Sequence, residues 1–218
     1  MIKIEDVDVF GFEAATRGLR NPMNSWDKSD SEWCSATLDC AMHTEVCDCG
    51  GYCVGKKDLK LMKSLSKAGN DHAKFLRMIN VTVDITAPLY WWKEFDTYKV
   101  GTVANSCSTM HKIHDKEFTL EDFSHEHLDD FNLAHLDKII SILNSMRALY
   151  VDSKNKHYWW QMIQLLPSSY NQKRTVQVNY QVLKSMYFAR KNHKLDEWVE
   201  FCKWCETLPY FKEICLNN

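Results

Sequence analysis

The segment from Asn80 to Thr86 alternates strictly between apolar and polar side chains, and it constrains the fold more than any other feature of the sequence. The apolar positions are Val81, Val83 and Ile85. The polar positions between them are Thr82, Asp84 and Thr86. A period of two places these sets on opposite faces of a β-strand, whereas a helix would mix them. The segment therefore predicts a strand with one buried and one hydrated face.

Two other segments also predict strands. Residues 2–10, with the sequence IKIEDVDVF, alternate in part. Residues 174–180, with the sequence RTVQVNY, set Val176 and Val178 against polar neighbours. Both patterns have the period of a half-buried strand. We therefore expect a sheet of at least three short strands.

Helical periodicity is strongest at residues 131–150. One apolar stripe there consists of Leu133, Leu136, Ile139, Ile140, Leu143 and Met146. Further helices are expected at residues 12–19, 56–68, 71–78, 88–99, 182–193 and 195–208. Gly69 ends the second of these, and Pro88 is the first helical residue of the fourth. Because strands and helices do not alternate regularly, we expect an α+β fold, with a small sheet packed with helices in a single domain spanning residues 1–218.

Composition excludes several classes of protein. The 218 residues are 45% hydrophobic and carry a formal net charge of −2. Such a chain has no basic field for a nucleic-acid polymer, although a small anionic ligand remains compatible. It also contains no run of about 18 apolar residues that would cross a membrane. The first ten residues lack the apolar core of a signal peptide, so we expect a cytoplasmic protein.

Residues 21–55 predict a long irregular, cysteine-rich insertion. They hold five of the nine cysteines and one histidine, namely Cys34, Cys40, His43, Cys47, Cys49 and Cys53. These ligand types suit zinc or iron, but only Cys49 and Cys53 have the spacing of a ligand pair and no second pair follows. Small buried thiols in a reducing compartment are the favoured interpretation, and no metal ligand is assigned.

The stretch from Glu94 to His114, EFDTYKVGTVANSCSTMHKIH, is rich in hydroxyl and amide side chains. Such donors suit a phosphate or a sugar. The alternative is a polar loop in which Ser106 or Ser108 caps a helix that begins at TMHKIH. These residues alone leave both interpretations open.

Three segments together resemble the flavin-dependent thymidylate synthases. They are DLKLMKSLSKAGNDHAKFLRMINVTVDITAP (58–88), LYWWKEFDTYKVGTVANSCSTMH (89–111) and LPSSYNQKRTVQVNYQVLKSMYFARKNHKLDEW (166–198). The match covers about half of the chain, and no single motif in it is specific alone. The resemblance implies methylation of dUMP with FAD, NADPH and methylene-tetrahydrofolate. It also implies a homo-oligomer, a tetramer, with active sites built from several subunits. We expect the segments 80–86 and 174–178 to be neighbours in one sheet.

The resemblance assigns two sets of site residues. The expected nucleotide-binding residues are Arg190, Lys99, Arg174, Ser108, Glu94 and Asn105. The expected flavin-binding residues are His72, Asn179, His193, Tyr98 and Thr97. No catalytic residue is assigned, because the reduced flavin supplies the chemistry in this family.

The family's Arg-His-Arg signature is replaced here by Thr97, Tyr98 and Lys99. A threonine cannot imitate the bidentate, always-charged guanidinium fork. We therefore expect FAD to be held weakly or not at all. Three functions follow as alternatives: a divergent flavin-dependent enzyme acting on a pyrimidine nucleotide, a non-catalytic nucleotide-binding protein that keeps the fold, or a metal-stabilised interaction protein built around the cysteines.

Overall fold

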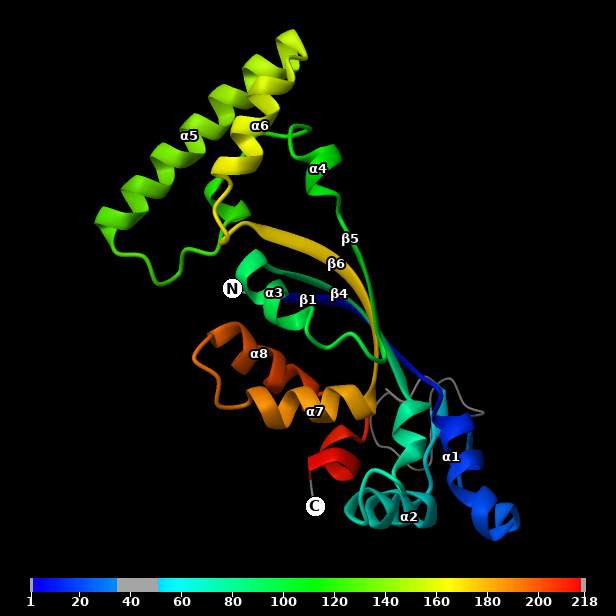
Figure 1. The fold of residues 1–218 in the computed structure, drawn as a ribbon. Coiled ribbons are helices and arrows are strands. Elements are labelled where there is room, and N and C mark those ends of the chain that lie inside the picture. Colours follow the sequence, from blue (N-terminus) through cyan, green and yellow to red (C-terminus); the bar gives the residue numbers. More distant parts are fainter. Residues whose placement is uncertain (1, 35–50, 217–218) are drawn as a thin grey trace. The chain divides into compact units, whose positions relative to one another are not determined.

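The structure is a computed structural model that describes residues 2–34 and 51–216. It has an α+β fold (Figure 1). Its strands are β1 (Lys3–Phe10), β2 (Glu32–Trp33), β3 (Tyr52–Cys53), β4 (Asn80–Pro88), β5 (Thr102–Ser106) and β6 (Asn171–Asn179). Its α-helices are α1 (Phe12–Arg20), α2 (Lys56–Lys67), α3 (Leu89–Phe95), α4 (Thr109–Lys112), α5 (Asp130–Ser153), α6 (Lys156–Leu165), α7 (Tyr180–Arg190) and α8 (Asp196–Cys205).

The main sheet has the strand order β1-β4-β6-β5. Strands β4 and β6 are therefore neighbours, as the sequence predicted. In β4 the side chains of Val81, Val83 and Ile85 are at most 1% exposed, while the polar residues between them are half-buried. This confirms that alternation sets which face of the strand meets the core. A second sheet pairs β2 with β3 in antiparallel fashion.

The chain divides into two compact units, which are described separately below. The first unit comprises Met1–Ile4, Asp84–Thr97 and Asn105–Thr175, and the second comprises Glu5–Val83, Tyr98–Ala104 and Val176–Asn218. Each strand of the four-stranded sheet contributes residues to both units. The single domain expected from the sequence stays a prediction.

A helical hairpin builds the core of the first unit. Helices α5 and α6 lie side by side (Figure 1). Leu136, Ile140 and Leu143 of the predicted apolar stripe of α5 belong to the buried core cluster. The other members of this cluster are Ile113, Phe118, Phe123 and Met162. The rings of Phe118, Phe123 and Tyr170 meet edge-on or tilted in this core.

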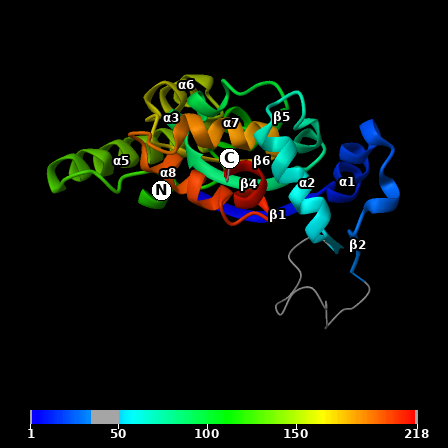
Figure 2. The same cartoon turned by 90° about the horizontal axis from the view of Figure 1, so that it is seen from below.

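Helices α7 and α8 contact each other in the second unit (Figure 2). Tyr180 and Trp198 on these helices are fully buried, as are Phe12 and Phe211 nearby. The Tyr180 hydroxyl donates to the Pro209 carbonyl oxygen at 2.7 Å, so the burial of this phenol leaves its polar atom satisfied.

Three expectations about local structure were wrong. Residues 102–106, expected as part of a polar loop, form β5, because β6 supplies the hydrogen-bonding partner that the local sequence does not reveal. The helix expected over 71–78 is only a 3₁₀ turn at Lys74–Arg77, since β4 begins too soon for a helix to propagate. Pro88 ends β4 and precedes α3 instead of starting it. Helix α6 was not foreseen.

A buried ion pair ties the start of the cysteine-rich segment to α2. Arg20 donates from Nε to Oδ1 of Asp58 at 2.6 Å, and the hydroxyls of Ser29 and Ser31 donate to Oδ2 at 2.6 Å each. Asp58 is completely buried. Burial alone would raise the pKa of Asp58, but the hydrogen bonds from Ser29, Ser31 and Arg20 outweigh it and lower the pKa.

Residues 35–50, which include Cys40, His43, Cys47 and Cys49, lie outside the described part of the chain. Cys53 is buried and Cys34 is partly buried. Among residues 2–34 and 51–216, no cluster of histidine, cysteine and carboxylate side chains has the arrangement of a metal site. No helix in this part of the chain has the length and apolar character needed to span a bilayer.

Candidate functional site

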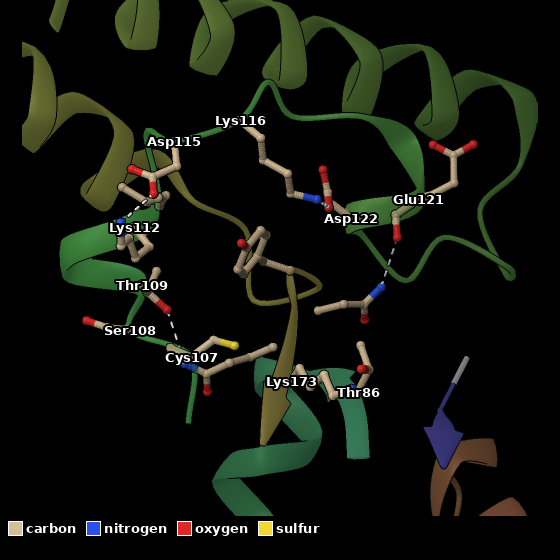
Figure 3. A pocket seen from close by; sticks show the side chains of 14 residues that line it. Thr86, Cys107, Ser108, Thr109, Lys112, Asp115, Lys116, Glu121, Asp122 and Lys173 are labelled. Atoms are coloured by element: carbon tan, nitrogen blue, oxygen red, sulfur yellow. Dashed lines mark hydrogen bonds and ion pairs between the residues drawn. The ribbon is translucent and has the colours of Figure 1, made fainter. Parts of the chain in front are cut away.

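The first unit contains a pocket of about 400 Å³ (Figure 3). Its walls come from the residues that follow β5, from α4, from the 3₁₀ turn at Leu120–Asp122 and from the beginning of β6. The lining consists of Thr86, Cys107, Ser108, Thr109, Lys112, Ile113, Asp115, Lys116, Glu121, Asp122, Tyr170, Asn171, Gln172 and Lys173. This volume lies within the usual range for small-molecule sites.

Pairing with β6 holds the polar stretch at the pocket. The backbone N–H of Cys107 donates to the Lys173 carbonyl oxygen at 3.0 Å. The side-chain amide of Gln172 donates to the Cys107 carbonyl oxygen at 3.0 Å and to Oγ1 of Thr109 at 3.1 Å. The C-terminal end of the stretch singled out in the sequence therefore forms one wall.

Ser108 caps α4, so the helix cap that the polar stretch offered is present, although the residues before it form β5 and not a loop. Its Oγ accepts a hydrogen bond from the backbone N–H of His111 at 3.2 Å. Ser108 also lines the pocket. The cap fixes the side chain, and it does not remove Ser108 from the surface that a ligand would meet.

Positive and negative side chains are balanced in the lining. Lys112 pairs with Asp115 at 2.8 Å, and Lys116 pairs with Asp122 (Figure 3). Lys173 bonds Asp84 at 2.9 Å. The side chains of Lys112 and Lys116 are each 72% exposed. The Lys112–Asp115 pair is exposed on both sides and therefore weak, whereas the Asp122 side chain is only 13% exposed, so Lys112 can change partner more readily than Lys116.

Tyr170 adds an aromatic wall with a polar tip. Burial raises the pKa of its phenol, and the negative charge of Asp122 raises the pKa further. The hydroxyl is therefore protonated at neutral pH and can donate a hydrogen bond. Neither Tyr170 nor the three lysines of the lining were expected as site residues from the sequence. The available signal was the four-residue spacing of Lys112, near the end of the polar stretch, and Lys116, just after it, and this spacing is common on helices.

A second group of predicted site residues meets in the second unit, around Trp198. Nε of Arg190 donates to the Tyr98 hydroxyl at 3.0 Å, and the guanidinium carbon lies 4.9 Å from the centroid of the Trp198 ring. The ring of His193 lies edge-on to Trp198 at 6.4 Å. Arg190 is the last residue of α7 and is half-buried against these rings. Lys99 is exposed.

Gly101 lies close to the start of α7. This glycine has a φ of 81°, and a Cβ on it would come within 3.0 Å of the side chains of Asn179 and Val182. Asn179 itself caps α7, since its Oδ1 accepts from the Val182 N–H at 3.1 Å. The side chain expected to contact a flavin thus has a structural role.

The remaining predicted residues are dispersed. Arg174 donates to Oδ1 of Asp96 at 2.7 Å and stacks 4.2 Å above the Trp92 ring. Thr97 donates its hydroxyl proton to the Glu94 carbonyl oxygen at 2.7 Å. Asn105 is exposed on β5, and His72 is exposed in the turn after Gly69.

Comparison with known proteins places the fold. No protein-family model matches the sequence. No curated protein matches it either. Two solved structures of the flavin-dependent thymidylate synthase ThyX from Helicobacter pylori, both with FAD and dUMP, match at TM-scores of 0.66 and 0.68. The chain shares the fold of these enzymes. The sequence identities are 16% and 15%, and the matches cover 98% or more of each chain.

The residues expected to contact FAD in a ThyX-like chain do not fit that cofactor here. A flavin dinucleotide needs fixed donors and positive charge for its phosphates. The Thr97 hydroxyl donates to backbone, the Tyr98 hydroxyl accepts from Arg190, and Nδ1 of His193 accepts the Leu195 N–H at 3.1 Å. Lys99 is the single cation among the three signature positions.

Proposed function

We propose that this chain binds a pyrimidine nucleoside monophosphate in the pocket of the first unit. The observation that carries the proposal is the lining: the stretch that resembles the family's signature, at Cys107–Thr109, borders a cavity of suitable size together with three lysines. The ThyX fold supports it, because the two similar structures hold dUMP.

The lysines can receive the phosphate. The side chains of Lys112 and Lys116 are exposed, and the surface ion pair of Lys112 with Asp115 contributes little to stability. A phosphate dianion is a stronger partner for an ammonium group than a hydrated carboxylate, and the hydroxyls of Ser108 and Thr109 offer further donors beside it. The phosphate therefore gains partners at low cost to the protein.

The base and sugar have candidate partners in the rest of the lining. The Tyr170 ring offers a face for stacking, which suits any pyrimidine. The amide of Asn171 is already oriented, since its Oδ1 accepts from the Ser124 hydroxyl at 3.3 Å and its Nδ2 donates to the Glu121 carbonyl oxygen at 3.4 Å. Such preorganised amides distinguish one base edge from another.

The residues assigned by the resemblance stay in the proposal as a second set. Arg190 is the family-type arginine kept in place, and Lys99 and Arg174 are the nearest substitutes for the lost signature charges. The proposal also includes a homotetramer, because the resemblance implies sites built from several subunits. A monomer at micromolar concentration in light scattering would contradict that part.

Binding without flavin chemistry is the form of the function that the side chains favour. The alternative is a divergent enzyme that methylates dUMP or a related nucleotide with FAD. The hydrogen bonds of Thr97 and Tyr98 within the chain favour a binding protein over a flavin enzyme. They occupy two of the three side chains at the signature positions.

Calorimetric titration of the full chain with dUMP, dTMP and dCMP tests the proposal. We expect Lys116→Ala, and more so the double variant with Lys112→Ala, to weaken binding by about tenfold per lysine, as for loss of a charged hydrogen bond. Lys138→Ala on the exposed surface of α5 removes the same charge outside the pocket and is the control.

Alkylation of Cys107 gives a site-resolved readout. This thiol is exposed and borders the pocket, whereas Cys53, Cys202, Cys205 and Cys215 are buried. Trypsin releases Cys107 on residues 100–112, which hold no other cysteine. A bound nucleotide should slow its alkylation. The ligand would lie elsewhere if the chain binds nucleotide tightly, Lys116→Ala binds it as tightly, and bound nucleotide does not slow the alkylation of Cys107.

A further inference from the structure

Residues 113–119, one wall of the pocket, form no regular secondary structure. This segment carries Ile113, Asp115 and Lys116 of the lining. A segment without ladder or helix hydrogen bonds has to be held by side chains from elsewhere if its lysine is to keep one position. The hairpin of α5 and α6 supplies those side chains.

Asn144 on α5 binds both backbone groups of one residue in this wall. Its Nδ2 donates to the Phe118 carbonyl oxygen at 2.9 Å, and its Oδ1 accepts the Phe118 N–H at 2.8 Å. The Phe118 ring is 5% exposed and anchors the same point in the core. The C-terminal part of the wall is thus fixed by one reciprocal pair of hydrogen bonds.

Arg147 holds the preceding residues one helical turn further along α5. Its Nε donates to the His114 carbonyl oxygen at 3.0 Å and its Nη2 to the Asp115 carbonyl oxygen at 3.3 Å. The fork of a guanidinium group can hold two adjacent carbonyls at once, which an ammonium group cannot do with the same geometry. Helix α6 adds a third support, because Nε1 of Trp159 donates to the Met110 carbonyl oxygen at 3.2 Å.

We infer that Asn144 and Arg147 are positioning residues for the pocket, an inference that rests on the proposed nucleotide binding. Neither residue belongs to the lining. Both act through the backbone of residues 114–118, which sets where the Lys116 ammonium group and the Asp115 carboxylate stand. The hairpin therefore supports ligand binding without touching the ligand.

The test uses Arg147→Met and Asn144→Leu, which keep much of the side-chain volume and remove the donors. We expect each to weaken dUMP binding by about fivefold to tenfold, measured well below the melting temperature of every variant. Arg147→Lys should recover part of the loss, since it keeps the charge and one donor. Lys138→Ala, on the same helix, should stay within about twofold of the unchanged chain.

Hydrogen exchange separates positioning from general stability. We expect the amides of residues 113–119 to exchange faster in Arg147→Met and Asn144→Leu while α7 and β4 exchange as before, and Cys107 to be protected less well by dUMP. Unchanged affinity alongside faster exchange of the wall would overturn the inference, as would unchanged exchange of the wall. If the unchanged chain binds none of the monophosphates, the proposed function fails, and the inferred role for binding fails with it; the exchange result then shows only whether the hairpin fixes the wall.

Discussion

Nε of Arg190 lies 3.0 Å from the hydroxyl oxygen of Tyr98, a residue 92 positions earlier in the chain. Tyr98 stands where the ThyX resemblance expects the histidine of the Arg-His-Arg signature. The arginine that the resemblance retains is therefore bonded to one of the residues that replaced the signature. Trp198 completes the arrangement, 4.9 Å from the guanidinium carbon.

Arg190→Ala is expected to affect both stability and binding. Loss of the Tyr98 hydrogen bond and of the stacking on Trp198 should lower the free energy of unfolding by about 1–2 kcal/mol. Binding of a nucleoside monophosphate should weaken by about 1.5–3 kcal/mol, because Arg190 belongs to the second set of proposed nucleotide ligands. Thermal melts and calorimetry of Arg190→Ala and Tyr98→Phe measure the two effects.

The matched control for Arg190 is Arg17→Ala. Arg17 is an exposed helical arginine paired with Glu13, and its loss should change stability by less than about 0.5 kcal/mol. A destabilised Arg190→Ala variant that binds nucleotide normally would leave Arg190 a purely structural role.

Two substitutions at Ser108 separate its role as a helix cap from a role at the ligand. Ser108→Asp keeps a capping oxygen for the His111 N–H but adds negative charge to the pocket. We expect its stability to match the unchanged chain and its nucleotide affinity to fall by about tenfold or more. Ser108→Ala should instead lower stability by about 0.5–1 kcal/mol with a smaller loss of affinity. Equal affinity in the Asp variant would remove Ser108 from the ligand site.

Asp58→Asn should destabilise the protein in a pH-dependent way. The carboxylate is completely buried against Arg20, and breaking such a pair costs on the order of 3 kcal/mol. Because folding lowers the pKa of Asp58 below 3.8, its contribution is fully present above that pH and is lost as the pH falls through the folded-state pKa. Urea denaturation at pH 7, 5 and 3 measures the free energy of unfolding of the unchanged chain and of Asp58→Asn. We expect the difference between the two values to become smaller only at pH 3. A difference that is constant over this range would contradict the coupling to Asp58.

The purified protein is expected to carry little or no FAD. Thr97 and Tyr98 are engaged within the chain, and only Lys99 supplies charge at the signature positions. Absorbance near 450 nm, followed by release of flavin on denaturation, measures the content. About one FAD per chain would show that other residues replace the lost arginines, and it would revive the enzyme alternative.

The sequence by itself determined the elements in which local pattern and burial agree. Val81, Val83 and Ile85 specify β4 and its buried face, because a period of two admits only one orientation of the strand. The stripe from Leu133 to Met146 specifies α5, because a repeat of three and four residues gathers on one side of a helix. The resemblance carried by three segments predicted the fold that the two ThyX structures share.

Only the tertiary structure decided the edge strand and the sites. Strand β5 has mostly exposed side chains, so no hydrophobic pattern marks it, and its pairing with β6 is a contact across more than 60 residues. Lys116 and Tyr170 have unremarkable neighbours in the sequence, and they meet Cys107 only where η4 (Leu120–Asp122), β5 and β6 converge. Side-chain contacts between distant segments depend on the tertiary fold of the whole chain, and the propensities of short segments do not encode them.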